Sequence, residues 1–257
     1  MNVSGLQVRR ALGFVALALA MVSGAANAAR AASINYGNFG PVVPGVKFVG
    51  VTESSTTDPV PLFGPPIPFS AGLDFDPIGF ASAAGAGSSD KTAGRLEFTI
   101  TTSPTLAITD LGLWEAGDFT LAGLGGASTT AMSSATITPV VTQINGVNVA
   151  PINLLPLSAT LGFNLLSNPG LLQPWSLSLS TNVAGQLGPG QWATSIDLVI
   201  DNALITASEA HSLAYLAKKD FQFTVTTQAV PEPSSLLLLS CGGLLGLAAA
   251  VRRRMKA

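Results

Sequence analysis

The sequence predicts an all-β protein: a single antiparallel β-sandwich, jelly-roll-like, with one short helix, an N-terminal signal helix and a C-terminal apolar helix. Apolar and polar residues alternate along many short segments, a period typical of strands with one buried face. Thr and Ser supply most of the polar positions, and Gly and Pro separate the segments. These features favour a sandwich. A β-solenoid is the alternative, although the chain shows no fixed repeat period of the kind a solenoid requires.

Residues 1–28 have the three parts of a secretory signal peptide. Two arginines precede an apolar core at 11–22, and Ala26 and Ala28 provide the small residues of a cleavage site. Residues 29–31 offer a second such site. Twelve apolar residues are too few for a stable membrane span, so we expect signal peptidase to remove this segment.

Residues 29–229 form the expected β-sandwich ectodomain. The alternation is clearest at 96–101, 175–180 and 221–226. Asn145-Gly146 predicts a hairpin over 139–153, because both residues tolerate the positive φ of a type I′ turn. Further strands are expected at residues 46–52, 67–76, 106–114, 119–124, 130–138, 157–165 and 193–206.

Three segments depart from the strand pattern. Residues 59–68 hold five prolines and residues 81–89 are almost entirely Ala, Gly and Ser, so both are expected to be surface loops. Residues 208–219 are the expected helix. Ser208 would be its N-cap, two leucines would share one face, and two lysines would lie favourably at its C-terminal end.

Charge and cysteine content exclude some classes of protein. Residues 29–230 carry six Lys and Arg against thirteen Asp and Glu, a net charge near −7, with no basic cluster. Nucleic-acid binding is therefore not expected, since it needs clustered cations to neutralise phosphates. The only cysteine, Cys241, lies in the C-terminal apolar run, so the ectodomain has no thiol and can form no disulfide.

The last 28 residues, 230–257, differ in composition from the rest. Their apolar run, residues 236–251, would make a helix of roughly 24 Å against a hydrocarbon core of about 30 Å, which suits a transient span. The basic tail should stay on the cytoplasmic side, so the ectodomain faces outward. The lead is Val230, Pro231, Glu232, Pro233, Ser234 and Ser235, and the basic tail contains Arg252, Arg253 and Arg254.

This order of a Pro-Glu-Pro lead, an apolar helix and an arginine cluster resembles the PEP-CTERM sorting signal. The resemblance implies an exopolysaccharide-producing, often biofilm-forming Gram-negative bacterium, in which an exosortase-type membrane enzyme recognises the segment near Pro231–Pro233. The enzyme would remove the tail and deliver the protein from the inner membrane to the cell surface or extracellular matrix. A tail anchor that is never cut is the alternative. The stretches 62–64, 73–77 and 201–221 are also similar to ectodomains of PEP-CTERM proteins of unknown role.

Few residues are suited to catalysis. His211 is the only histidine, no Gly-x-Ser-x-Gly motif is present, and zinc ligands of the His and Cys type are lacking. Glycoside hydrolysis needs only two carboxylates, so a secreted hydrolase is an alternative, although the sequence indicates no particular pair. We therefore expect no catalytic residues and no enzyme.

Calcium is the one metal with candidate ligands. Asp74 and Asp76 are two residues apart on an expected strand, which places both carboxylates on one face just before the chain turns at Pro77. In the alternative interpretation, Leu73 and Phe75 point into the core and the two aspartates simply face water. Apart from this Ca²⁺ candidate we expect no cofactor.

Tryptophans are the candidates for stacking on a sugar. Trp175 is in phase with two leucines of an alternating segment and is expected in the core. Trp192 follows a Gly- and Pro-rich stretch and is the best candidate for an exposed ring, with Trp114 as a further one. The sequence thus predicts an exported structural and interaction protein of the cell surface or matrix, with a module that binds carbohydrate, such as exopolysaccharide, as the alternative.

Overall fold

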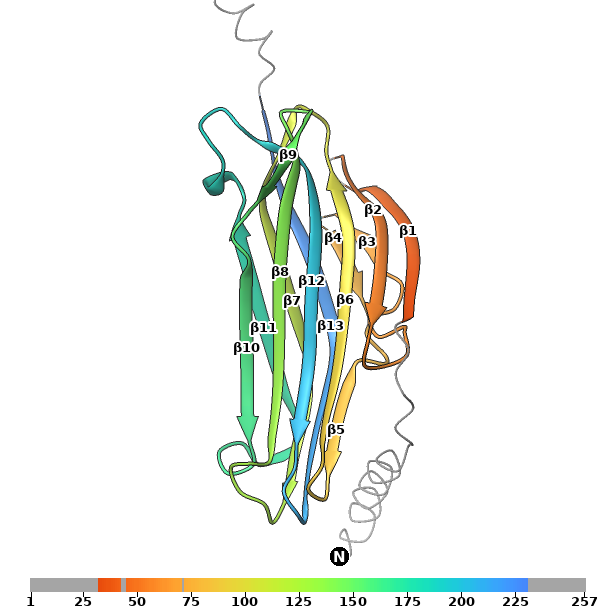
Figure 1. Cartoon of the computed structure of the whole chain (residues 1–257), viewed down its shortest axis with the longest axis vertical. Helices are drawn as coiled ribbons and strands as arrows, with labels where there is room; N and C mark the ends of the chain where they lie inside the picture. The colour runs from red at the N-terminus through yellow and green to blue at the C-terminus, as the bar shows by residue number, and fades with distance from the viewer. Residues whose placement is uncertain (1–31, 43–44, 71, 231–257) are drawn as a thin grey trace, which may run out of the picture.

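Two layers of antiparallel strands make up most of the described chain. The computed structural model describes residues 32–42, 45–70 and 72–230 (Figure 1). In these residues the only helical element is a single 3-10 turn, η1 (Ala184–Gln186). The strands are β1 (Ala32–Val42), β2 (Val46–Ser55), β3 (Ile67–Phe69), β4 (Gly72–Phe75), β5 (Ala81–Gly85), β6 (Ser89–Thr101), β7 (Leu106–Gly123), β8 (Thr130–Ile144), β9 (Val147–Asn153), β10 (Leu157–Asn164), β11 (Gly170–Asn182), β12 (Ala193–Ala207) and β13 (Ser212–Ala229).

The strand pairs define a front sheet and a back sheet. The front sheet has the order β1-β2-β6-β12-β8-β10, with β9 also paired to β8. The back sheet has the order β11-β7-β13-β4-β3, with β5 also paired to β13. A pairing of Ala193 with Ile108 joins the two layers at one end. Figure 1 shows β8, β12 and β6 in front of β7 and β13. The long strands β11, β12 and β13 alternate between the sheets, so the C-terminal half of the chain ties the layers together.

The hydrophobic core lies between the sheets and is rich in phenylalanine. Alternate residues of β6 and β12 point inward and are buried, as the period of two requires. Phe63 packs edge-to-face on Phe80 and Phe221, with ring centroids 4.9 and 5.0 Å apart. Burying one such side chain contributes about 1.5–3 kcal/mol. Six phenylalanines are buried to 1% exposure or less: Phe48, Phe63, Phe75, Phe80, Phe221 and Phe223.

The structure confirms the two-sheet β architecture and most of the expected strands. The hairpin at 139–153 forms as predicted: β8 and β9 pair on either side of Asn145 and Gly146, whose φ values are 55° and 79°. The strands are longer than expected, because the segments at 106–114 and 119–124 are one strand, β7. The segment at 67–76 instead divides into the short strands β3 and β4.

The predicted helix at 208–219 is wrong. Residues 208–211 form the turn between β12 and β13, and β13 begins at Ser212. Leucines three apart suggested one helical face, but Leu216 is buried and Leu213 is half-buried on the other side of a strand. Pairing with β7 along the whole of β13 overrides the local preference.

The two expected surface loops are also corrected. Residues 81–89 form β5, a tight turn and the start of β6, because small residues can pair closely with β13. Residues 59–66 are irregular as expected, but the segment is not a plain surface loop. Leu62 and Phe63 within it are 1% and 0% exposed and belong to the core.

The C-terminal end of β13 lies at the upper end of the sandwich, next to the β8–β9 hairpin (Figure 1). The backbone N–H of Val230 donates to the carbonyl of Thr105 at 2.8 Å, so the chain is still held to the fold one residue after β13. Within the described part of the chain, no helix is long and apolar enough to cross a membrane. The expected spanning segment, residues 236–251, lies outside the described residues.

Candidate functional site

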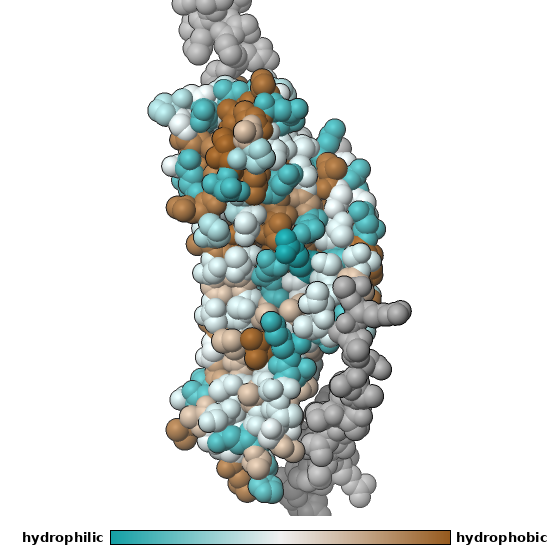
Figure 2. Space-filling model, viewed as in Figure 1, coloured by the Kyte–Doolittle hydropathy of each residue, from teal (hydrophilic) through white to brown (hydrophobic). Residues whose placement is uncertain are grey.

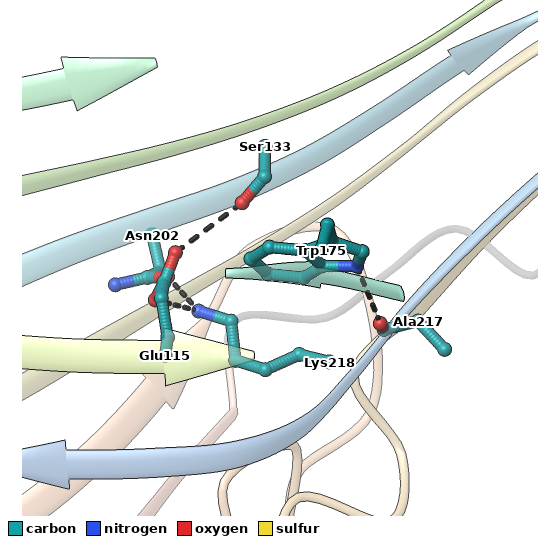
Figure 3. Close-up of polar contacts among 6 residues, drawn as sticks. All are labelled: Glu115, Ser133, Trp175, Asn202, Ala217 and Lys218. Carbon is teal, nitrogen blue, oxygen red and sulfur yellow. Dashed lines mark hydrogen bonds and ion pairs between the residues drawn. The ribbon is translucent and has the colours of Figure 1, made fainter. Parts of the chain in front are cut away.

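A buried polar cluster lies between the two sheets, where an amphipathic sandwich should hold only apolar side chains. Glu115 comes from β7, Lys218 from β13 and Asn202 from β12, and they are 0%, 1% and 3% exposed. Figure 3 shows the carboxylate and the carboxamide converging on the lysine amine from the two sheets. We refer to these three residues as the buried triad.

The contacts within the buried triad are direct. Lys218 Nζ donates to Glu115 Oε2 and to Asn202 Oδ1. The other carboxylate oxygen, Glu115 Oε1, accepts a hydrogen bond from Ser133 Oγ at 3.2 Å. Beside the cluster, Trp175 Nε1 donates to the carbonyl of Ala217, the residue before Lys218, at 3.1 Å (Figure 3).

Aromatic rings surround the lysine amine. Nζ of Lys218 lies 4.7, 5.2 and 5.6 Å from the ring centroids of Phe80, Phe221 and Phe63. Ring faces attract a cation, but they cannot hydrate it as water does. Burial therefore lowers the pKa of the Lys218 amine below its ordinary value, and the adjacent Glu115 carboxylate opposes this shift. The surroundings favour a neutral amine more than a solvent-exposed position would.

A glycine in the facing strand leaves room for two of these rings. A Cβ on Gly94 of β6 would lie 2.8 Å from ring carbons of both Phe63 and Phe80. Real Cβ atoms do not approach ring carbons so closely, so only glycine at this position lets β6 of the front sheet pack against Phe63 and Phe80. Gly94 of β6 thus makes room for the rings that surround the Lys218 amine of the buried triad.

A second buried carboxylate, Glu53 of β2, holds the loop that carries Phe63. Glu53 is 0% exposed. Its carboxylate oxygens accept hydrogen bonds from the backbone N–H groups of Leu62, Phe63 (3.1 Å) and Gly64 (3.3 Å). Tyr36 donates its hydroxyl to Glu53 Oε2 at 2.7 Å. Glu53 is therefore the anchor that places the aromatic loop over the triad.

Sequence reasoning missed the buried triad, although a signal was present. Glu115 is in phase with Leu111 and Leu113 along β7, and Asn202 is in phase with Ile200 and Leu204 along β12. A polar residue in the inward phase of an alternating strand is a candidate for a buried site. The helix predicted at 208–219 instead places Lys218 at its C-terminal end, which gives no indication that the side chain is buried.

The outward face of the front sheet carries a shallow depression of about 340 Å³. Hydroxyls and charges line it, among them Ser54, Lys91, Arg95, Thr136 and Asp201. Figure 2 shows strongly polar residues gathered midway along this face and apolar ones at its upper end.

Arg95 is the centre of the charges in this depression. Its Nε lies 2.6 Å from Glu97 Oε1, and its Nη1 lies 3.7 Å from Asp201 Oδ1. Both carboxylates are therefore paired with the same guanidinium on an exposed surface.

The three tryptophans occupy three different environments. Trp175 is 5% exposed, which agrees with its expected place in the core. Trp192 is half-buried: its Nε1 donates to the carbonyl of Pro104 at 3.0 Å, and its backbone N–H donates to Asn145 Oδ1 at 2.9 Å. Trp114, on the outward face of β7, is 38% exposed. Of the three rings, Trp114 presents the most surface to solvent.

Asp74 and Asp76 lie where β4 ends. Asp74 is half-buried and pairs in register with Gln222 of β13, while Asp76 is exposed. Leu73 and Phe75, which alternate with the two aspartates along the chain, are fully buried, as the alternative interpretation required. Among residues 32–42, 45–70 and 72–230, no three His, Cys, Asp or Glu side chains are grouped so that they could hold a metal ion. The Ca²⁺ candidate thus gains no third carboxylate from the fold.

Of the expected sorting motif, only Val230 belongs to the described part of the chain. Pro231, Glu232, Pro233, Ser234 and Ser235 lie outside it. So do the basic tail, Arg252, Arg253 and Arg254, the signal cleavage residues Ala26 and Ala28, and the single Cys241.

Comparison with protein families identifies the C-terminal segment. The PEP-CTERM protein-sorting motif matches residues 229–254, from the last residue of β13 onward. This confirms the resemblance found in the sequence. The motif indicates an exported protein that an exosortase sorts to the cell surface. A search of curated proteins found no match.

Several solved structures are similar to parts of the chain. A non-crystalline cellulose specific carbohydrate-binding module, CBM28, shares 13% identity over 54% of this chain and 66% of that one, with a TM-score of 0.27. TmCBM61, solved in complex with β-1,4-galactotriose, shares 8% identity over 78% and 92%, with a TM-score of 0.22. The enzymatically active domain of bacteriophage CBA120 tailspike protein 4 shares 14% over 78% and 20%, with a TM-score of 0.21. TM-scores this low give no information about the ligand or the activity of this chain.

Proposed function

We propose that this protein is a structural and interaction protein of the cell surface or extracellular matrix, without enzymatic activity, in an exopolysaccharide-producing Gram-negative bacterium. The observation that carries the proposal is the sorting motif at 229–254, which begins on the last residue of the last strand. Cleavage after Ala28 by signal peptidase and near Pro231–Pro233 by the exosortase would leave the sandwich as the mature product. The segment at 236–251 would contact the membrane only until the second cut.

The sandwich that remains suits a structural role. Its strands are held by continuous antiparallel ladders, and its core is filled by aromatic and aliphatic side chains. With no thiol outside the C-terminal run, its stability derives from packing and hydrogen bonds, so a reducing environment would not weaken it.

The surface suits contact with hydrated polymers. Hydroxyl side chains follow the outward faces of two neighbouring edge strands, and each hydroxyl can both donate and accept a hydrogen bond. Exposed examples are Ser158 and Thr160 of β10 and Ser176, Ser178 and Ser180 of β11. The proposed partner of this surface is the exopolysaccharide of the matrix.

The test is the intact mass and location of the native protein. In the producing bacterium we expect a product without residues 1–28 and without the arginine-rich tail, in the surface or matrix fraction. Deletion of the exosortase should leave the tail in place and hold the protein in the membrane fraction. A wild-type product that keeps Arg252–Arg254, or that is found in the cytosol, contradicts the proposal.

The depression on the front sheet favours carbohydrate binding as a second candidate function. Its lining of hydroxyls around Arg95 and Asp201 suits hydrogen bonds to a sugar. Pairing of both carboxylates with Arg95 argues against a hydrolase here, because glycoside hydrolysis needs two carboxylates that can reach the scissile bond from opposite sides. Gel retardation by the producer's own exopolysaccharide should weaken in Arg95→Ala and persist in Lys47→Ala, a surface control on β2. Unchanged retardation in Arg95→Ala, or none in the wild type, contradicts binding at this depression.

A further inference from the structure

The buried triad holds the three groups that an amide-forming reaction needs. Lys218 supplies an amine, Asn202 a carboxamide, and Glu115 a carboxyl group that can carry a proton; Nζ contacts both of the others. We propose that Lys218 and Asn202 become joined by an intramolecular isopeptide bond after folding, with Glu115 as the proton carrier. This modification does not depend on the proposed function.

The fold already brings the reacting atoms together. Nζ touches Asn202 Oδ1, and the carbonyl carbon lies only about 1.2 Å beyond that oxygen. The backbones are fixed by ladders on both sides: Asn202 pairs with Gly94 and Ala135, and Lys218 pairs with Gly117. Groups held in this way react as if at very high concentration, so the slow attack of an amine on an amide becomes feasible.

The surroundings favour the nucleophilic form of the amine and exclude water. The three residues are at most 3% exposed, and phenylalanine rings cover the amine. Burial lowers the pKa of the Lys218 amine, which makes loss of its extra proton easier. Glu115 lies against Nζ and can accept that proton.

A polar atom without a partner marks the leaving group. Asn202 Nδ2 is buried and has no hydrogen-bond partner among the described residues. An orphaned buried donor is costly and rare in native proteins. The proposed reaction removes this atom from the protein as ammonia.

The reaction also explains why charges are buried here. A buried lysine–carboxylate pair is often no more stable than apolar side chains of the same size, so its presence calls for another reason. In the reaction one Nζ proton passes to Glu115, which ends neutral, and one passes to the departing Nδ2. The third remains on the new amide N–H. The Nζ–Cγ bond forms, the Cγ–Nδ2 bond breaks, ammonia leaves, nothing is oxidised or reduced, and both buried charges disappear.

The bond would join the two sheets covalently. Asn202 belongs to β12 of the front sheet and Lys218 to β13 of the back sheet, so the cross-link spans the core. It would take the place that a disulfide holds in other exported domains, in an ectodomain with no thiol.

Peptide mapping of the full chain tests the bond directly. Glu209 lies between the two residues in the sequence, and cleavage after glutamate separates residues 116–209 from the peptide that begins at Ala210. In the denatured, fully digested wild type we expect these two peptides as one species, about 17 Da lighter than their sum for the lost ammonia. Fragmentation should place the link at Asn202 and Lys218. Two separate peptides of unchanged mass, or a link at other residues, overturn the proposal.

Variants distinguish the bond from chance cross-linking. Asn202→Ala should release the two peptides, whereas Lys219→Arg, which alters the exposed neighbouring lysine, should leave them linked. A linked species that survives in Asn202→Ala overturns the assignment of the acceptor.

The role of Glu115 has its own readout. In Glu115→Gln, which keeps the shape of the side chain, we expect the linked fraction to fall at least tenfold while far-UV circular dichroism still reports a β fold. If that variant does not fold, Glu115→Asp retains an acid and should link, at a reduced rate. Full linkage in a folded Glu115→Gln protein, or none in a folded Glu115→Asp protein, overturns the role of Glu115 as proton carrier.

Discussion

The anchor residue Glu53 allows the sharpest test of how this fold is held together. Its carboxylate is fully buried and accepts three backbone N–H groups of the loop at 62–64 and the hydroxyl of Tyr36. It forms no ion pair with a basic side chain of the described residues. The hydrogen bonds alone therefore compensate for burying this group.

Glu53→Ala should be strongly destabilising. It leaves three buried donors without an acceptor, and each such donor costs about 1–3 kcal/mol. We expect the free energy of unfolding to fall by about 4 kcal/mol or more, which lowers Tm by about 8–16 °C in a domain of this size. Glu53→Gln keeps one carbonyl oxygen for Leu62 and Phe63, and its amide can donate to the Tyr36 hydroxyl. Only the N–H of Gly64 then lacks an acceptor, so the expected loss is about 2 kcal/mol.

Urea unfolding of the exported domain, followed by tryptophan fluorescence, measures both losses. Glu97→Gln on the exposed face is the matched control, since its ion pair with Arg95 is solvated and its loss should cost no more than about 1 kcal/mol. A Glu53→Ala protein within about 1 kcal/mol of the wild type would refute the argument that this carboxylate holds the aromatic loop.

Three further expectations follow from particular contacts. The pKa of Tyr36 is raised by burial and by its hydrogen bond to Glu53, and the pKa of Tyr215 is raised by burial and by Asp118. Unfolded tyrosines ionise near pH 10 while these stay neutral, so stability should be complete below pH 10 and decline above it. Ultraviolet absorbance measured at alkaline pH reports the ionisation of Tyr36 and Tyr215. If either tyrosine titrates near pH 10 in the folded protein, its expected rise in pKa is contradicted. Gly94→Ala should cost about 1–3 kcal/mol by crowding Phe63 and Phe80, and an unchanged Tm would show that the rings can yield. For Asp74 and Asp76 we expect the same Tm in excess EDTA and in millimolar CaCl₂, since no third carboxylate of the residues that the structure describes joins them. A higher Tm in CaCl₂ than in EDTA would contradict this expectation and support a Ca²⁺ site at Asp74 and Asp76.

Strand identity in this protein was largely predictable because it depends on a local pattern. The alternation at 96–101 and the Asn145-Gly146 turn act through neighbours in the sequence, and β6, β8 and β9 form where they were expected. The predicted helix at 208–219 was wrong because the conformation there depends on a strand that is distant in the sequence. Residues 212–219 carry leucines and lysines that suit a helix, yet β7 pairs with all of β13 and imposes the strand.

The sequence by itself determined where the protein is sent and that it is built of β-strands. A sorting signal is recognised as a linear segment, and strand periodicity repeats every second residue, so both can be read without knowing what lies across the core. Only the tertiary structure decided which polar side chains meet inside it. Glu115 and Lys218 are 103 residues apart, and their contact exists because β7 and β13 pair in one particular register. A shift of that register by one residue would turn the side chains of the shifted strand to the opposite face of the sheet, so Glu115 and Lys218 would no longer both point into the core.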